Sequence, residues 1–204
     1  MVRSQVGGQE RKSQLPARTE RYVRAGLAFP ILVRVGAMSD ELPITMTQIS
    51  LLLHDIRSVH NVGSILRTAD AAGVSRVYLS GYTPIPIDRF GRKRRDMQKV
   101  SLGAEDSVPW EFVEDPLNLI EKMQREGYEV VCLEQRKGST DHREFHCTRR
   151  TLLVVGTETT GVSENLIEAS NRVIEIKQYG KKESLNVSVA LGIALFQLRS
   201  QQSP

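Results

Sequence analysis

The sequence has few of the residues that mark disulfide-rich or membrane proteins. Only two of its 204 residues are cysteines, Cys132 and Cys147, so no disulfide framework is evident and a reduced, cytoplasmic compartment fits best. The short apolar stretch at residues 25–33 is followed by Arg34 and is too short to cross a membrane. We expect no signal peptide, because no small-residue cleavage site follows this stretch. The chain is therefore expected to have no membrane partner.

The common catalytic signatures are missing as well. The chain has no dinucleotide-binding G-x-G-x-x-G motif and no Walker lysine. No Ser/His/Asp set, pair of catalytic carboxylates or cysteine nucleophile stands out. His142, His146 and Cys147 lie close together, but their spacing does not suit a tetrahedral site. We interpret them as solvated loop residues and expect no metal.

Positive charge is unevenly distributed along the chain. The formal net charge is +4, and residues 1–45 contribute seven cations and four anions. We expect these residues to form a basic, flexible N-terminal extension, disordered at least over residues 1–24, ahead of one domain at 46–200. Residues 88–99 hold six cations and two anions. This window is either a solvated charge run or a phosphate-binding loop, with its cations at Arg89, Arg92, Lys93, Arg94, Arg95 and Lys99.

Apolar segments from residue 48 onward alternate between strand and helix patterns, and no internal repeat is visible. Residues 151–155 are the most apolar and are expected to form a strand buried on both faces. The alternation predicts an α/β fold with a mainly parallel sheet and helices on both faces. We predict strands at 49–54, 75–79, 128–133, 151–155 and 172–176, and helices at 61–72, 116–126, 163–170 and 185–198.

The first motif with chemical potential is N-V-G-S-I-L-R-T-A at residues 61–69. Asn61 is expected to cap the helix, while Gly63 and Arg67 are four residues apart and share a helix face. Gly63 leaves room for a ligand or for another backbone. Apolar neighbours predict that Arg67 is partly buried, and a partly buried guanidinium needs a partner. The alternative is an ordinary surface arginine on an amphipathic helix.

Two further motifs follow strands and contain glycine turns. G-T-E-T-T-G at 156–161 comes after the buried strand, where α/β sheets bind ligands, and Glu158 is its only charge. Alone, it could be a plain strand-to-helix turn. The third motif of the chain, S-L-N-V-S-V-A at 184–190, follows the turn at Gly180. Ser184 is expected to cap a mostly buried helix, and Asn186 lies in the first turn, where free N–H groups favour an electron-rich ligand. A capped core helix is the alternative.

Together the three motifs resemble the SpoU (TrmH-type) branch of the SPOUT RNA methyltransferases. The first is similar to the family's N-x-G-x-x-x-R-T-A, the second to its G-x-E-x-x-G, and the third to its S-L-N-V-S-V-A. The likeness runs from about residue 48 to residue 197, and the stretch at 101–110 is also similar. The chain departs from the family pattern at one place. The family usually has Ile-Pro-Met before the glycine turn that precedes the third motif, whereas this chain has Ile-Lys-Gln at 176–178, ahead of Gly180.

The resemblance implies a C-terminal deep trefoil knot, bound S-adenosylmethionine and a homodimer with its active site at the subunit interface. The implied reaction is methyl transfer to a ribose 2′-hydroxyl of tRNA or rRNA, with Arg67 as base or as the group that orients the hydroxyl. The implied orienting residues are Asn61, Glu158, Ser184 and Asn186. The implied cofactor-binding residues are Leu133, Gly156, Ile176, Gly180 and Leu185. RNA recognition would use the basic window, at Arg89, Arg92, Lys93, Arg94 and Arg95.

Two other functions stay open at this point. The chain could be a non-catalytic RNA-binding relative, although it keeps Arg67, Glu158 and Asn186. It could also methylate a base nitrogen instead of a ribose.

Overall fold

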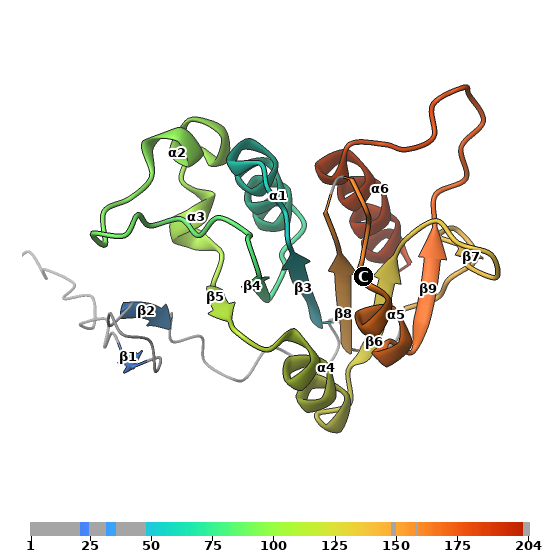
Figure 1. Cartoon of the computed structure of the whole chain (residues 1–204), viewed down its shortest axis with the longest axis horizontal. Coiled ribbons are helices and arrows are strands. Elements are labelled where there is room, and N and C mark those ends of the chain that lie inside the picture. The colour runs from blue at the N-terminus through green and yellow to red at the C-terminus, as the bar shows by residue number, and fades with distance from the viewer. Residues whose placement is uncertain (1–20, 25–31, 36–47, 148–149, 158, 202–204) are drawn as a thin grey trace, which may run out of the picture.

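The computed structural model describes residues 21–24, 32–35, 48–147, 150–157 and 159–201 (Figure 1). Its main feature is a seven-stranded sheet with the order β5-β4-β3-β8-β6-β9-β7, in which every neighbouring pair is parallel. The predicted parallel α/β fold is confirmed. The strands are β3 (Gln48–His54), β4 (Arg76–Ser80), β5 (Trp110–Val113), β6 (Glu129–Leu133), β7 (Thr140–Asp141), β8 (Arg150–Val155) and β9 (Arg172–Glu175).

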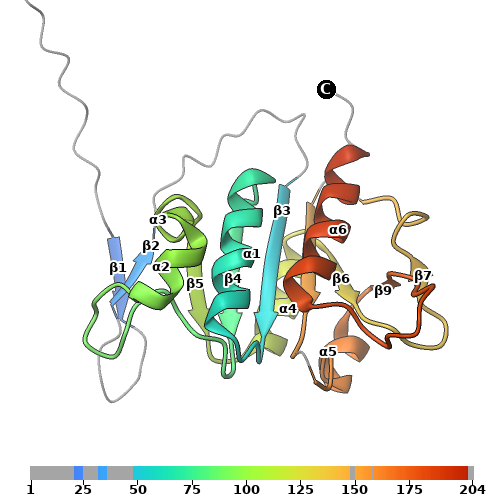
Figure 2. The same ribbon diagram turned by 90° about the horizontal axis from the view of Figure 1, so that it is seen from above.

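Helices cover both faces of this sheet. Alternate residues of β3 divide the core: Leu51 and Leu53 pack with α1, α2 and α6, whereas Leu52 packs with α4 and α5 on the opposite face. Figure 2 shows α1 and α6 side by side along one face. The helices are α1 (Val59–Ala71), α2 (Arg95–Ser101), α3 (Ala104–Ser107), α4 (Pro116–Arg125), α5 (Glu164–Ala169) and α6 (Val187–Ser200).

Local signals account for most helix boundaries. Asp115 caps α4 by accepting the N–H of Asn118 at 3.0 Å, and Pro116 follows at the first helical position. Gly73 and Gly127 follow α1 and α4 with φ of 64° and 83°, the left-handed conformation that glycine adopts without strain. The predicted ends of these two helices are therefore confirmed.

Two predicted caps are wrong by two or three residues. Ser58, not Asn61, caps α1, and its hydroxyl accepts the backbone N–H of Asn61 at 3.2 Å. Asn186, not Ser184, caps α6. In both motifs two or more residues with capping side chains stand close together, and the sequence does not say which backbone leaves the helical conformation.

Within the predicted domain at 46–200, the sequence analysis missed four elements, namely α2, α3, β5 and β7. The last residues of the basic window lie in α2, so only residues 88–94 form a loop. Within the extension, Arg21–Arg24 (β1) pairs antiparallel with Leu32–Val35 (β2), so residues 21–24 do not belong to a disordered tail as expected. The rest of the predicted extension lies outside the described residues.

Helix α6 has two apolar faces with different surroundings. One face is buried against α1 and the sheet and carries Leu191, Ala194, Leu195 and Leu198. The other is exposed, with 50% of Val189, 41% of Ile193 and 50% of Phe196 accessible. The expectation that this helix is mostly buried is thus wrong within one chain. None of the helices in the described part of the chain is long and apolar enough to span a bilayer.

Candidate functional site

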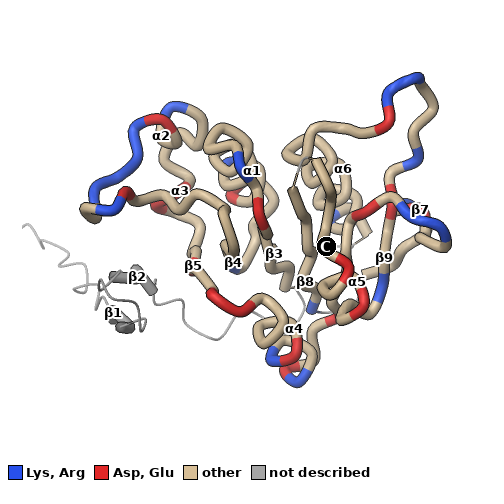
Figure 3. The backbone as a smooth tube through the Cα atoms, in the orientation of Figure 1, with Lys and Arg blue, Asp and Glu red and all other residues tan. Residues whose placement is uncertain are grey.

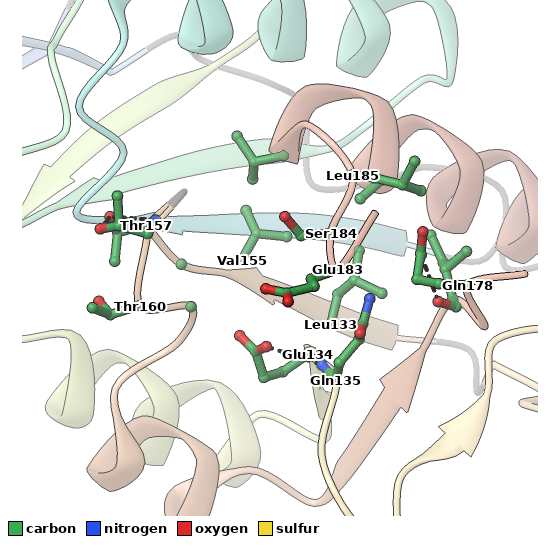
Figure 4. A pocket seen from close by; sticks show the side chains of 16 residues that line it. Leu133, Glu134, Gln135, Val155, Thr157, Thr160, Gln178, Glu183, Ser184 and Leu185 are labelled. Carbon is green, nitrogen blue, oxygen red and sulfur yellow. Dashed lines mark hydrogen bonds between the residues drawn. The ribbon is translucent and has the colours of Figure 1, made fainter. Parts of the chain in front are cut away.

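A cavity of about 430 Å³ opens at the carboxyl ends of β6, β8 and β9, beside the start of α6 (Figure 4). This is the edge of a parallel sheet where ligands bind in α/β proteins, and the volume lies in the range of small-molecule sites. Three chain segments form its wall: Leu133, Glu134 and Gln135; Val155, Gly156, Thr157, Thr159, Thr160 and Gly161; and Ile176, Gln178, Glu183, Ser184, Leu185, Val187 and Ala190.

The wall of the cavity combines apolar side chains with two carboxylates. Leu133, Val155 and Ile176 offer apolar surface, whereas Glu134 and Glu183 carry negative charge (Figure 4). No lysine or arginine is among the described lining residues. The cavity therefore suits a ligand with an apolar body and a positive charge, and it does not suit a polyphosphate.

The glycine turn after β8 is held in place by backbone contacts and by Glu134. Thr157 and Gly161 exchange two backbone hydrogen bonds of 3.1 and 3.0 Å, and Glu134 Oε2 accepts the N–H of Val162 at 2.8 Å. A side chain at position 156 would collide with the backbone of Gly161, and one at position 161 would be strained because φ there is 72°, in addition to meeting the Glu134 carboxylate. Both glycines are therefore needed for this close approach, which brings backbone groups to the cavity.

The first turns of α1 and α6 meet directly. The Asn186 side chain accepts the backbone N–H of Ser188 at 2.9 Å and its hydroxyl at 2.6 Å. Its amide nitrogen then donates to Asn61 Oδ1 at 3.2 Å. The first and third motifs, 125 residues apart in the chain, are thus linked by the two asparagines that the sequence singled out.

Arg67 does not have the predicted burial. Its side chain is exposed, because Ile65, Leu66 and Ala69 point into the core while position 67 lies on the outer side of α1. No described residue forms a hydrogen bond or ion pair with its guanidinium, and it does not line the cavity. Gly63, in contrast, is buried against α2, where a Cβ would lie 3.1 Å from the Met97 carbonyl oxygen. Of the two reasons considered for this glycine, close approach of another backbone is the one realised here.

An ion-pair network holds the segment that replaces the family's Ile-Pro-Met. Asp141 is buried and accepts Arg143 Nη2 at 2.6 Å and Nε at 2.9 Å, while Lys177 Nζ lies 3.5 Å away. Arg143 Nη2 also donates to Tyr179 Oη at 3.2 Å. The Arg143 side chain, and secondarily its backbone N–H, lowers the pKa of the Asp141 carboxyl far below its usual value. Residues 177 and 179 are thereby tied to β7, next to Ile176 and Gln178 in the cavity wall.

Figure 3 shows the cations of the basic window following one another along the chain into α2, but much of their charge is paired. Arg92 pairs with Asp88 at 2.8 Å, Lys93 with Asp106 at 2.5 Å and Arg94 with Asp96 at 2.8 Å. The hydrogen bonds that Arg94 donates to the Asp96 carboxylate raise the pKa of Arg94. Among the described residues no carboxylate pairs with Arg89 or Arg95. The window therefore presents fewer uncompensated charges than the sequence count suggests.

The structure gathers most, but not all, of the predicted site residues. Leu133, Gly156, Ile176, Ser184 and Leu185 line the cavity, and Asn61 bonds to Asn186 at its side. Gly180 is exposed and does not line the cavity, so its role stays a prediction. Glu158 lies outside the described residues.

Sequence reasoning missed Glu134, Glu183 and Asp141. A signal existed for the first, because Glu134 directly follows a buried strand at the ligand-binding edge of the sheet. No local pattern distinguishes the other two from surface carboxylates, since their roles arise from contacts with the cavity and with β9.

Comparison with known proteins agrees with this geometry. The sequence model of the SpoU rRNA Methylase family matches residues 48–196. The tRNA (guanosine(18)-2'-O)-methyltransferase of Aquifex aeolicus is 31% identical over 169 residues, which are 83% of this chain and 77% of that protein. The 23S rRNA (guanosine-2'-O-)-methyltransferase RlmB of Escherichia coli K12 is 36% identical over 155 residues, 75% of this chain and 60% of its own length. The chain thus spans less than two thirds of that second relative.

Solved structures give the same result. The Aquifex aeolicus TrmH/SpoU tRNA modifying enzyme aligns with a TM-score of 0.66 and 30% identity, covering 78% of each chain. An AdoMet-bound rRNA methyltransferase from Sinorhizobium meliloti aligns with a TM-score of 0.67 and 28% identity, covering 77% of this chain and 57% of that one. The cavity at the glycine turns, the linked asparagines and the family match over most of the described sheet lead to one conclusion: this chain belongs to the SpoU rRNA methylase family.

Proposed function

We propose that this protein transfers a methyl group from S-adenosylmethionine to a ribose 2′-hydroxyl of tRNA or rRNA. The observation that carries the proposal is that the three motif segments lie together. The motifs at 156–161 and 184–190 contribute to the wall of one cavity, and the motif at 61–69 is joined to the latter by the hydrogen bond between Asn186 and Asn61. The named activities of the relatives, on guanosine 2′-oxygens of tRNA and 23S rRNA, give the same reaction.

The cavity fits the proposed cofactor in shape and charge. When bound, S-adenosylmethionine supplies an electrophilic methyl group on a positively charged sulfonium, so the reaction needs no metal. Leu133, Ile176 and Leu185 would enclose the apolar part of the ligand, and the backbone at Gly156 would supply hydrogen bonds. Glu134 and Glu183 favour its positive charge.

The polar groups outside the cavity are assigned to the substrate. An arginine is a poor general base because the pKa of its guanidinium lies above about 12. We therefore assign Arg67 primarily to holding the 2′-hydroxyl or an adjacent phosphate, and a role as base only if its solvation is lost. Asn61, Ser184 and Asn186 would orient the ribose beside it, and Glu158 is proposed for the same group of residues.

The exposed face of α6 supports a homodimer. Leu185, Val189, Ile193 and Phe196 recur at helical spacing and form one apolar stripe that no described segment of the chain covers. The stripe begins at the cavity, so a second copy of the chain seated on it would bring its own groups to the cavity mouth. Arg67, which lies outside the cavity of its own chain, is proposed to act on the cavity of the partner.

The proposed trefoil knot involves the segment between β9 and α6. This segment leaves β9 at one side of β6 and β8, passes the glycine turn after β8 in the cavity wall, and ends where α6 packs against α1. Such a path around the turn at 156–161 is compatible with the knotted threading expected for the family.

A direct assay tests the proposed function. Purified protein is incubated with methyl-labelled S-adenosylmethionine and total tRNA or rRNA from a strain that lacks the gene, and the RNA is digested to nucleosides for mass analysis. We expect label in a 2′-O-methylnucleoside. RNA binding without any transfer would support the non-catalytic alternative, and label in a base would support the base-nitrogen alternative.

A genetic experiment then identifies the substrate. Ribose methylation is mapped site by site in tRNA and rRNA of the deletion strain and its parent. We expect one site, or a few sites, to lose methylation, and to regain it with the wild-type gene but not with the Arg67→Ala variant.

A further inference from the structure

The tip of the basic window is an ordered turn with an exposed aromatic ring. The backbone N–H of Asp88 donates to the Arg92 carbonyl at 2.8 Å, and residues 87 and 93 form a bridge below it. Asp88 Oδ1 then accepts the N–H groups of Phe90 at 2.8 Å and Arg92 at 2.9 Å. These contacts fix the direction of the turn, and the Phe90 ring at its end is 65% exposed.

Two guanidinium groups lie against this ring. The Cζ atoms of Arg89 and Arg92 are 4.8 and 4.9 Å from the Phe90 ring centroid, within the range of cation–π contacts. Cationic groups therefore already lie over the phenyl ring, which is still 65% exposed. A nucleobase is a planar group of similar width, and it can stack on a phenyl ring or on a guanidinium plane.

The charges around the ring indicate which partner suits it. Arg92 is neutralised by Asp88, whereas Arg89 has no carboxylate partner in the described part of the chain. The turn thus presents an aromatic face beside an uncompensated cation. Unpaired RNA offers an exposed base next to a phosphate, which matches this pair of groups, whereas an apolar protein surface would leave Arg89 without a partner.

We propose that Phe90 is a stacking site for an unpaired nucleobase of the RNA substrate, with Arg89 contacting the adjacent phosphate. This inference rests on the proposed RNA substrate. It adds a base-contacting aromatic residue to a window that the sequence marked only by its charge, and it implies that the RNA reaches the protein with a loop or bulge, not as a continuous duplex.

The test compares Phe90→Ala with Phe90→Trp and with the control Leu102→Ala. Leu102 is also 65% exposed but is aliphatic, so its removal takes away exposed apolar surface without a ring. Affinity is measured without the cofactor for a stem-loop RNA with an unpaired loop and for a fully paired duplex that contains the same stem. For the stem-loop we expect Phe90→Ala to weaken binding by about 5- to 100-fold, Phe90→Trp to restore it, and Leu102→Ala to leave it unchanged.

Several outcomes would overturn the stacking proposal. One is an unchanged affinity of Phe90→Ala for the stem-loop. If this variant keeps its RNA affinity but loses association with another protein, the ring is a protein contact and the stacking proposal is wrong. Another is an equal loss of affinity for the stem-loop and the duplex. Because affinity is measured without the cofactor, the result holds whether or not methyl transfer occurs. If the wild type binds RNA through Phe90 but transfers no methyl group, the proposed function fails while the stacking site stands.

Discussion

The cavity and the surface around Arg67 are built differently. Three segments of a single chain enclose the cavity, and hydrogen bonds from Glu134 and between Thr157 and Gly161 fix its glycine turn. Arg67 is exposed and has no partner among the residues that the structure describes. Under the proposed function, one chain would hold the cofactor, whereas the substrate would be arranged by the RNA together with a second subunit.

Removing the space at the glycine turn is expected to have the largest effect on the cavity. In Gly156→Ala the new Cβ would collide with the backbone of Gly161, which cannot move without breaking its bonds to Thr157. We expect cofactor affinity, measured by calorimetry, to fall by about 100-fold or more, as is typical when a rigid backbone contact is displaced. Circular dichroism then shows whether the variant is folded.

Two further variants keep this prediction testable. Gly192→Ala adds the same methyl group at a helical position outside the cavity wall, where the nearest atom is Thr68 Cγ2 at an ordinary contact distance of 3.7 Å, so cofactor affinity is expected to stay within about twofold. Glu183→Lys changes an exposed wall residue without disturbing the core and is expected to weaken binding of the cationic ligand. Wild-type affinity in Gly156→Ala would show that the cavity is not the cofactor site.

The opposite half of the comparison is tested at Arg67. Arg67→Ala is expected to lower kcat by about 100-fold or more, while the dissociation constant of the cofactor changes by less than about twofold, because the guanidinium lies outside the cavity. Radiolabel transfer and calorimetry give the two values. If cofactor affinity falls together with kcat, Arg67 acts at the cavity of its own chain, and the cavity and the surface around Arg67 are not separate parts of the site.

Mixed dimers show on which subunit Arg67 acts. Arg67→Ala and Glu183→Lys subunits are each expected to be inactive, one for lack of the guanidinium and the other for lack of bound cofactor. If Arg67 reaches across the interface, a heterodimer of the two regains one working site, up to about half of the wild-type rate for a dimer with two independent sites. If Arg67 serves its own chain, the mixture stays inactive.

The apolar stripe on α6 is the proposed connection between the two halves. Phe196→Glu would place a carboxylate in the proposed dry interface, at a cost on the order of several kcal/mol. We expect sedimentation to give a monomer, methyl transfer to be lost, and cofactor binding to weaken by less than about tenfold. Leu102→Glu, at an exposed apolar residue that follows α2 and is not part of α6, is expected to remain dimeric. A dimeric Phe196→Glu variant would assign the stripe to another partner.

The sequence predicted the parts of this fold that depend on local pattern. The strand at 151–155 and the helix ends at Gly73 and Gly127 were correct, because burial on both faces and left-handed glycines leave clear signals. The short strand at Thr140–Asp141 left none, since two residues carry no periodicity.

The site was predictable as a set of motifs but not as a geometry. Asn61 and Asn186 were singled out for their positions at helix starts, and the structure joins them. The burial of Arg67 was misjudged because apolar neighbours along the chain do not show on which side of a helix the core lies. The role of Asp141 depends on the pairing of β7 with β9, which no local pattern reveals.

The smallest expected effect concerns residues 176–179, the segment beside the cavity that Asp141 and Arg143 hold in place. Because Asp141 holds Arg143 and Lys177, its folded-state pKa lies below its unfolded value near 3.9, so the carboxylate stabilises the fold above that value and the stabilisation fades as the pH falls. Asp141→Asn is expected to be less stable than the wild type at pH 7, with a smaller difference at pH 3, by urea unfolding.

Cofactor affinity extends this test to the site. Asp141→Asn releases residues 177 and 179, so we expect it to bind the cofactor a few-fold more weakly. We expect no change in kcat at saturation, because the ion-pair network contacts residues 177 and 179 and not the reacting groups. Asp96→Asn removes an exposed carboxylate paired with Arg94 and is expected to change neither the stability to urea nor the cofactor affinity measurably. Equal behaviour of the two variants would mean that the segment replacing Ile-Pro-Met is held by its own backbone, and that the cavity does not depend on β7.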